Sequence, residues 1–215
     1  MDNSFSISDP TNIALFKKIC DTVKNLSECL YIKITDTDIN FQVMDDVKIS
    51  IINICFDKQY FDIFDIKHNN NICINIVDFT KILKNCSKTN TIHFKLKHET
   101  NILSITSKLD ESINKKFKIN LQDTSFYNWI NIDTFNSNNP QISILSKTLQ
   151  TIISELNVFS DYLIIKKKKN NNKLLFIIDD VDNNIFSKYE LNDIDILNTE
   201  NIQLIVSLNN LNNFK

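Results

Sequence analysis

The chain has 215 residues, of which 42% are hydrophobic, so it is long enough to bury one large core or two small ones. Its formal net charge of −2 excludes a uniformly basic coat for nucleic acid but allows a local basic face. All 24 basic residues are lysines, so bidentate arginine readout of guanine is excluded, and any contact with DNA is expected to be sequence-independent.

The first predicted element is a helix of about residues 12–26, which Thr11 caps. Apolar residues recur along it at helical spacing and predict the buried stripe Phe16, Ile19, Val23 and Leu26. Alternating or continuous apolar runs then predict strands at residues 29–35, 39–44, 47–56, 61–66 and 73–77.

A second helix is predicted from Asp78 to about Cys86, directly after the last of these strands. Its inward residues are expected to be Phe79, Ile82, Leu83 and Cys86. A hairpin of residues 91–97 and 102–109 and a strand at 115–121 complete this part of the chain.

Residues 122–140 break the pattern and predict a connector between two domains, residues 1–121 and 141–215. The connector is rich in Asn and Asp, yet it carries large apolar residues, including Trp129, the single tryptophan of the chain. Two interpretations stay open for these apolar residues: they pack on a domain surface, or they are poised to hold a partner.

The second domain repeats the order of elements of the first, about 130 residues later. A helix is predicted at residues 146–157, followed by strands at 162–168, 173–179, 185–191 and 202–208 and a last helix at 209–215. In the first copy three more strands follow the corresponding helix, so the second copy is expected to be incomplete. Either the sequence is a fragment, or this domain lacks strands and exposes sheet edges.

Lysines cluster on the polar side of both predicted helices of the first domain. Lys17, Lys18 and Lys24 lie on the first, and Lys81, Lys84 and Lys88 on the second. Either this is an ordinary solvated helix face, or it is a basic surface that meets phosphates. A separate run, Lys166 to Lys169, is predicted at a hairpin tip, as a solvated turn or as an import signal or DNA contact.

Side chains typical of catalysis or metal binding do not form a recognisable pattern. The five cysteines are scattered without a Cys-x-x-Cys pair and are expected to be buried free thiols, so no metal site and no cofactor are predicted. The sequence has no nucleotide-binding loop and no hydrolase motif, and an enzyme is not expected. Because no signal peptide and no long apolar run is seen, a soluble intracellular protein without membrane contact is expected.

Residues 16–121 resemble the first domain of the sliding DNA clamps of the proliferating cell nuclear antigen family. Three segments carry the resemblance, in the family's order: Phe16-Lys17-Lys18-Ile19, Ile39 to Asp45 with its Gln-x-Met-Asp turn, and Thr80 to Lys84. The resemblance implies a divergent or viral member that lacks the C-terminal strands. It also implies an α+β clamp fold of two similar domains, with helices on one face of antiparallel sheets.

The resemblance further implies a ring, usually a homotrimer, in which the helices line a hole that holds double-stranded DNA. Subunits would join by edge strands, residues 115–121 against residues 185–191 of the neighbour. The residues that match the family's DNA-facing lysines are Lys17, Lys18, Lys24, Lys81 and Lys84, with Lys147 in the second domain. The second-domain helix departs from the family's basic pattern at Gln150, Thr151, Ser154 and Asn157, so weaker DNA contact is expected there.

Partner peptides of the family bind an apolar pocket beside the connector. The matching residues are Met44, Leu121, Phe126, Trp129 and Ile130, whereas the pocket wall that the family's extreme C-terminus supplies is expected to be missing. The implied partners are DNA polymerase, other proteins with clamp-binding peptides, and a clamp loader. The implied location is the nucleus, or a cytoplasmic replication site for a viral protein. The alternative is a viral accessory factor for transcription or replication that does not encircle DNA.

Overall fold

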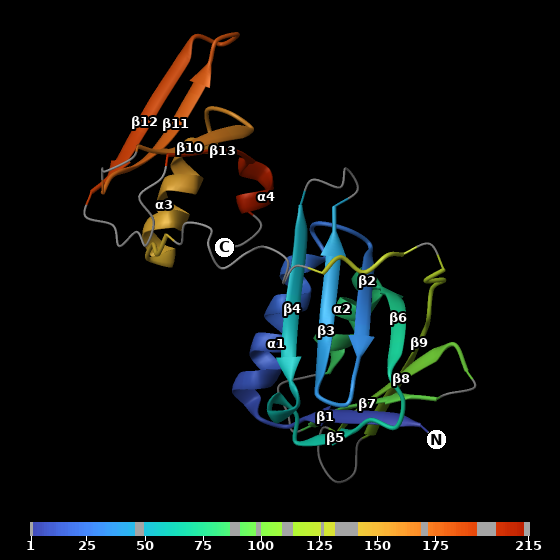
Figure 1. Ribbon diagram of the computed structural model, residues 1–215. Coiled ribbons are helices and arrows are strands. Elements are labelled where there is room, and N and C mark those ends of the chain that lie inside the picture. The colour runs from blue at the N-terminus through green and yellow to red at the C-terminus, as the bar shows by residue number, and fades with distance from the viewer. Residues whose placement is uncertain are drawn as a thin grey trace. The chain divides into compact units, whose positions relative to one another are not determined.

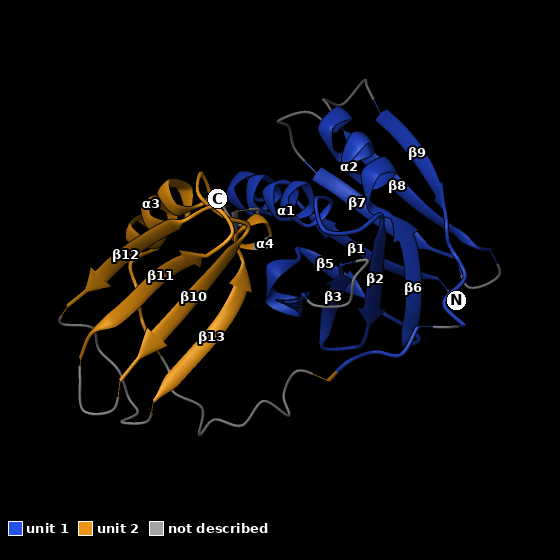
Figure 2. Ribbon diagram, turned by 90° about the horizontal axis from the view of Figure 1, so that it is seen from above, with its two compact units in different colours: residues 1–130 blue, residues 131–215 orange. Residues whose placement is uncertain are grey.

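The computed structural model describes residues 2–45, 50–86, 91–97, 100–108, 114–125, 127–131, 142–168, 172–192 and 201–212. The backbone divides into two compact units, residues 1–130 and 131–215 (Figure 2). Each unit has helices, antiparallel strands and a buried apolar cluster of its own. Unit 1 therefore contains the described first part of the predicted connector.

Helix α1 spans Pro10–Val23, and its first turn is capped by Asp9. The Asp9 carboxylate accepts a hydrogen bond from the Asn12 backbone N–H at 2.8 Å, which satisfies one of the unpaired donors of the first turn. Pro10 follows at a first-turn position, where its missing N–H costs nothing. The prediction of Thr11 as the cap was therefore wrong by two residues.

The buried stripe of α1 consists of Ile13, Phe16, Cys20 and Val23. The prediction placed Ile19 on this stripe, but Ile19 is only half-buried at the margin of the core. Leu26 is buried as predicted, although it lies beyond the end of the helix. The rest of the helix surface is more accessible and carries the lysines together with the exposed Leu15.

The strands after α1 form a four-stranded antiparallel sheet of order β4-β3-β2-β6 (Figure 1). The strands are β2 (Cys29–Ile34), β3 (Asp38–Met44), β4 (Ile51–Asp57) and β6 (Asn70–Asn75). Helix α2 (Ile76–Asn85) starts directly after β6, because the Asn75 side chain accepts from the Asp78 N–H at 3.0 Å and caps it. The prediction of a strand at residues 73–77 was therefore wrong at both ends: β6 begins three residues earlier, and residues 76 and 77 belong to α2.

A second sheet, of order β5-β1-β7-β8-β9, completes unit 1. Its strands are β1 (Asn3–Ile7), β5 (Ile63–Asp65), β7 (Thr91–Leu96), β8 (Ile102–Lys108) and β9 (Asn114–Asn120), and a short 3-10 turn, η1 (Lys58–Tyr60), precedes β5. Strand β1 was not predicted. Asn3 fixes it in place: the buried carboxamide donates to the His68 carbonyl at 2.7 Å and accepts from the Lys67 N–H at 2.7 Å.

Phe16 lies at the centre of the unit 1 core, where α1, α2 and both sheets meet. Its ring centroid is 5.7 Å from that of Phe41 on β3 and 5.4 Å from that of Phe56 on β4. Phe79 on α2 and Phe94 on β7 lie at 6.3 and 5.8 Å. These rings hold the two helices on the inner face of the β4-β3-β2-β6 sheet and leave its outer face to other contacts.

Unit 2 repeats the topology of the β4-β3-β2-β6 sheet of unit 1 and of its two helices. Its elements are α3 (Ser146–Leu156), β10 (Tyr162–Lys167), β11 (Leu174–Asp180), β12 (Ile185–Leu191), β13 (Ile202–Ser207) and α4 (Leu208–Asn212). The sheet order β12-β11-β10-β13 matches β4-β3-β2-β6 strand for strand in chain order, with one helix before and one after. The duplication predicted from the sequence, and the α+β fold class, are confirmed.

The structure corrects two local predictions, one on the lysine run and one on the cysteines. Lys166 and Lys167 belong to strand β10 and Lys167 is buried, so the hairpin tip of the lysine run begins later than predicted; Lys169 lies outside the described residues. In the turn before β12, Asn184 adopts φ 53°, a left-handed conformation that asparagine tolerates. All five cysteines are free thiols, but Cys55 is exposed and Cys29 half-buried.

Candidate nucleic-acid interface and connector face

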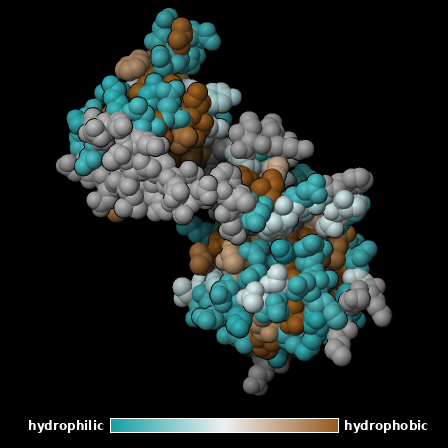
Figure 3. All heavy atoms as spheres, in the orientation of Figure 1, coloured by the Kyte–Doolittle hydropathy of each residue, from teal (hydrophilic) through white to brown (hydrophobic). Residues whose placement is uncertain are grey.

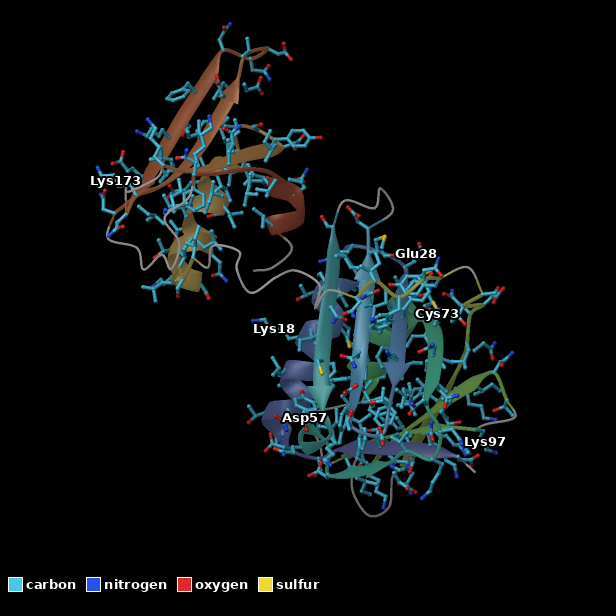
Figure 4. The ribbon with its side chains drawn as sticks, in the orientation of Figure 1. Lys18, Glu28, Asp57, Cys73, Lys97 and Lys173 are labelled. Carbon is cyan, nitrogen blue, oxygen red and sulfur yellow. The ribbon has the colours of Figure 1, made fainter. Side chains whose placement is uncertain are left out.

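Helices α1 and α2 pack against each other and turn their polar sides away from the core of unit 1. Lys18, Lys81 and Lys84 are exposed on this surface, and Lys17 and Lys24 are half-buried there. Figure 4 shows Lys18 projecting from α1 into solvent. The five lysines predicted in unit 1 therefore lie on one surface built from two helices, which we call the lysine face. Lys88 lies outside the described residues.

A carboxylate stands among these lysines. Asp21 on α1 forms ion pairs with Lys24, the C-cap of the same helix, and with Lys84 on α2, the latter at 3.0 Å between Nζ and Oδ1. These bonds hold the pKa of Asp21 below its ordinary value, and Asp21 in turn raises the pKa of Lys84. Two of the predicted phosphate-binding ammonium groups are thus engaged with one acid on the protein itself.

Lys17 plays a structural part as well. Its ammonium group donates to the backbone carbonyl of Cys86, the C-cap of α2, and Lys115 donates to the carbonyl of Asn85, the last residue of the helix, at 3.1 Å. Cations at the C-terminal end of a helix satisfy its free carbonyls and complement its dipole. Burial lowers the pKa of Lys17. This lysine is therefore less available to an external phosphate than its position in the sequence suggests.

The remaining two lysines differ in their surroundings. Lys81 pairs with Asp78, one turn earlier on α2, at 2.9 Å. Within the described residues Lys18 is the member of the set whose ammonium group makes no ion pair or hydrogen bond. A shallow groove of about 270 Å³ runs between the two helices, and its lining residues are Lys17, Lys18, Asp21, Thr80, Leu83 and Lys84.

The connector crosses the outer face of the β4-β3-β2-β6 sheet, on the side opposite to the helices (Figure 1). Successive strand residues alternate between the two faces, so Phe41 points to α1 and Gln42 points to the connector. The connector is first attached at β6, where the Gln122 N–H donates to the Cys73 carbonyl at 2.8 Å. In Figure 4 Cys73 lies beside this segment.

Gln42 makes the second attachment. Its carboxamide nitrogen donates to the Ile130 carbonyl at 2.8 Å, and its oxygen accepts from the Ile130 N–H at 3.0 Å and from the Tyr127 hydroxyl. Gln42 has no exposed surface, and burial raises the pKa of Tyr127 to about 12, so the hydroxyl remains a protonated donor at neutral pH. One buried side chain thereby satisfies three polar groups of the connector.

Aromatic contacts hold the same segment between its two attachments. The Tyr127 ring stacks on Tyr31 of β2 at 3.4 Å between centroids, and Trp129 packs edge-on against Tyr127 at 6.3 Å. The Lys33 ammonium lies 5.9 Å from the centre of the Trp129 ring, within range of a cation–π contact. Tyr127 and Trp129 therefore pack on the domain surface, whereas Ile130 is exposed, so the interpretation that the connector holds a partner stays open.

The outer side of the β4-β3-β2-β6 sheet and connector residues 127–130, which cross it, form one surface that we call the connector face. Of the predicted partner-binding residues it holds Met44, Trp129 and Ile130, whereas Leu121 follows β9 and packs against the core of unit 1. Met44 follows Gln42 by two residues on β3 and shares its outward side, next to the strand position that holds Ile130. Ile130 is 39% exposed, and Leu121 and Trp129 are half-buried. Phe126 lies outside the described residues. Elsewhere this side of unit 1 is mostly hydrophilic, with apolar side chains interspersed (Figure 3).

Residues 10–128 match the family model described as "Proliferating cell nuclear antigen, N-terminal domain". The chain belongs to the proliferating cell nuclear antigen family. It is also 27% identical over 154 residues to a protein named "DNA polymerase sliding clamp" from Cenarchaeum symbiosum (strain A). The aligned region covers 70% of this chain and 58% of that relative, so the chain spans little more than half the length of the clamp it matches.

The family match covers both helices of the lysine face and the start of the connector. Unit 2 lies outside it, and its helix α3 carries Lys147, which is exposed. Further along α3, the Thr151 hydroxyl donates to the Lys147 carbonyl at 3.0 Å and the Ser154 hydroxyl to the Thr151 carbonyl at 2.9 Å. These side chains are thus occupied by their own helix. The roles of all six lysines toward DNA stay predictions.

Sequence reasoning missed three residues of the connector face: Tyr31, Gln42 and Tyr127. Gln42 was part of the motif that carried the family resemblance, but nothing in the motif indicates what its side chain binds. No local signal marks its burial, because the strand alternates and Gln42 shares its face with the half-buried Asp38 and Asn40. The identity of its partner, 88 residues away along the chain, needs the structure.

Replacing Gln42 by leucine should release the connector while leaving the sheet intact. The change removes both hydrogen bonds to Ile130 and the acceptor of Tyr127, at about 0.5–1.5 kcal/mol for each bond. We expect the Ile130 amide to exchange with solvent at least about tenfold faster and Trp129 fluorescence to shift to longer wavelength. Gln59→Leu, an equal change at an exposed site on η1, is the matched control. Unchanged exchange at Ile130 would show that Gln42 does not hold the connector.

Two classes of site are not found in the part of the chain that is described. No group of three or more His, Cys, Asp or Glu side chains is placed to hold a metal ion there. In the same residues, no helix has the length and apolar character needed to cross a membrane.

Proposed function

We propose that this chain is a sliding clamp and a processivity factor for DNA polymerase. It encircles duplex DNA and tethers replication and repair proteins to it. The observation that carries the proposal is the separation of the two faces: α1 and α2 present lysines on one side of the sheet, and the connector lies on the other. A clamp needs such a separation, because DNA and partner proteins must be held at the same time.

The lysine face suits a weak, mobile hold on duplex DNA. A lysine ammonium is a compact, hydrated point charge on a flexible stem, without the fixed fork of arginine. Contacts of this kind to successive phosphates position a duplex without reading its sequence. Encirclement would then supply the lifetime of the complex, while each contact to a phosphate stays short-lived. Lys17, Lys18, Lys24, Lys81, Lys84 and, more weakly, Lys147 are the proposed DNA-facing residues.

Ring closure would use free sheet edges. β9 is the last strand of the sheet β5-β1-β7-β8-β9, and β12 is the first of the sheet β12-β11-β10-β13, so each has one edge unpaired in the described structure. Pairing β9 of one subunit with β12 of the next is a head-to-tail contact that can close into a ring, and it would protect both edges from aggregation. A homotrimer is the proposed assembly.

The connector face is the proposed site for polymerase and other clamp-binding peptides, with Met44, Leu121, Phe126, Trp129 and Ile130 as contact residues. The proposed function is non-enzymatic, since a clamp acts by topological linkage. A clamp loader is the further partner that a closed ring requires. The proposed location is the nucleus, or a cytoplasmic replication site if the protein is viral.

The alternative is an accessory factor of the same fold that acts in transcription or replication without encircling DNA. The observation in its favour is α3, where a single lysine is followed by Gln150, Thr151, Ser154 and Asn157. A ring lined in part by such a helix would hold DNA less strongly on that side.

Oligomeric mass and retention on DNA test the proposed function. A clamp should form a trimer in sedimentation, stay on nicked circular DNA after loading, and be lost from the same DNA once a restriction cut creates ends. The circular and linear forms differ only in topology, so they are matched controls for each other. A monomer or dimer that binds both forms equally would instead establish the accessory factor.

A further inference from the structure

Asp21 occupies an unusual position on a surface proposed to meet phosphates. It lies on α1 beside the groove between the helices and faces α2, where its carboxylate engages Lys84 at 3.0 Å together with Lys24. Within the lysine face it is one of two acids, and the other, Asp78, pairs with Lys81 alone. Among the residues that the structure describes, Asp21 is thus the one acid that engages ammonium groups from both helices.

Stabilisation of the fold gives only a weak account of this arrangement. The Asp21 side chain is 47% exposed and that of Lys84 is 62% exposed. Ion pairs between such exposed side chains contribute little to folding, because water screens them and the side chains lose freedom. Packing of α1 against α2 rests instead on buried apolar contacts such as Phe16 with Phe79.

The effect of Asp21 on a bound polyanion would be larger. A carboxylate in the groove repels phosphates, and it also competes with them for two ammonium groups. Each lysine that neutralises a phosphate contributes about 0.9 to the slope of log affinity against log salt. Because Asp21 competes with phosphates for Lys24 and Lys84, it reduces the contribution of these two lysines to the slope.

We propose that Asp21 limits the affinity of the lysine face for duplex DNA by holding Lys24 and Lys84 in internal ion pairs. This inference rests on the proposed DNA-facing role of the helices. As a consequence, the ammonium groups of Lys24 and Lys84 alternate between Asp21 and the phosphates of a moving duplex. The duplex is then held loosely enough to move, and no phosphate gains a permanent partner.

The test is Asp21→Asn in the full chain, with binding of a labelled duplex of about 30 base pairs of arbitrary sequence measured by anisotropy across a salt series. We expect affinity at low salt to rise about three- to tenfold, and the slope of log affinity against log salt to steepen by about 1 to 2, at about 0.9 for each released lysine. Asp21→Glu should restore affinity and slope close to those of the wild type.

Asp65→Asn is the matched control, because Asp65 on β5 also pairs with a lysine, Lys67, but lies on a strand away from the two helices. Thermal unfolding of each variant reports the fold, and Asp21→Ser removes the same charge with a different side chain if Asp21→Asn proves unstable. If wild type binds and Asp21→Asn matches wild type or Asp65→Asn, Asp21 does not limit affinity, while the proposed function stands. If no variant binds duplex DNA even at low salt, the DNA-facing role of the helices fails.

Discussion

Replacing Lys18, Lys81 and Lys84 together by alanine should reduce the salt dependence of DNA binding more than any other change to this chain. Each lysine that meets a phosphate contributes about 0.9 to the slope of log affinity against log salt. Loss of Lys18 should therefore lower the slope by about 0.9, and loss of Lys81 and Lys84, which Asp78 and Asp21 partly occupy, should lower it by less than that for each lysine. We expect at least about a tenfold loss of affinity at low salt and faster loss from circular DNA. The measurement is the anisotropy of a labelled duplex across a salt series, on the full chain.

The choice of these three lysines follows from the structure. Lys17 is left in place because it bonds the Cys86 carbonyl at the end of α2, and its loss would affect the fold as well as the charge. The three replaced lysines are exposed, and alanine is the best helix former, so the helices should persist. Lys58, Lys97 and Lys108, exposed residues outside both helices, make an equal change of charge as the control triple. Equal slopes for the two triples would refute the assignment of the lysine face.

Periodicity was enough to predict which sides of α1 and α2 carry lysine. Lys17, Lys18 and Lys24, like Lys81 and Lys84, differ from the apolar stripe in the helical repeat, and a helix on a sheet must bury its apolar side. Small errors in the stripe, such as Ile19 in place of Cys20, did not change the polar side. The local pattern therefore located the lysine face, although it could not show which ammonium groups are free.

Contacts between residues far apart in the chain decide which lysine ammonium groups are free. Asp21 and Lys24 are three residues apart, so their pair can be expected from one helix. The pair of Asp21 with Lys84 depends on how α1 packs against α2, and the bond from Lys17 to Cys86 depends on where α2 ends. Gln42 belongs to the same class, because its partners lie at the far end of the connector. No local pattern encodes these distances.

The errors at element boundaries have a related cause. Residues 72–77 form a nearly continuous apolar run, and such a run fits a buried strand and the first turn of a buried helix equally well. The cap at Asn75 decides between them, since its side chain bonds the Asp78 N–H and starts α2. Strand β1 was not predicted because its first inward residue is the polar Asn3. The local sequence does not show that Asn3 accepts hydrogen bonds from the backbone of Lys67 and His68.

Replacing Phe16 by alanine should be the most destabilising single change in unit 1. The side chain is 1% exposed and contacts rings from α2 and from both sheets, so its loss leaves a cavity that four separate elements would have to close. Burial loss and cavity formation together predict a decrease of about 3–5 kcal/mol in the free energy of unfolding. Urea denaturation followed by Trp129 fluorescence measures it, since Trp129 packs on unit 1.

The neighbouring residue supplies the control for this change. Leu15 is 48% exposed on the same helix, so Leu15→Ala removes an aliphatic side chain without opening the core, and it should alter stability by less than about 0.5 kcal/mol. Because Phe16 joins α1 to both sheets and to α2, partial unfolding in Phe16→Ala should also disperse the lysine face and weaken DNA binding in the same urea range. If Phe16→Ala matched Leu15→Ala in stability, α1 would not be anchored through this ring, and the geometry of the lysine face would need another support.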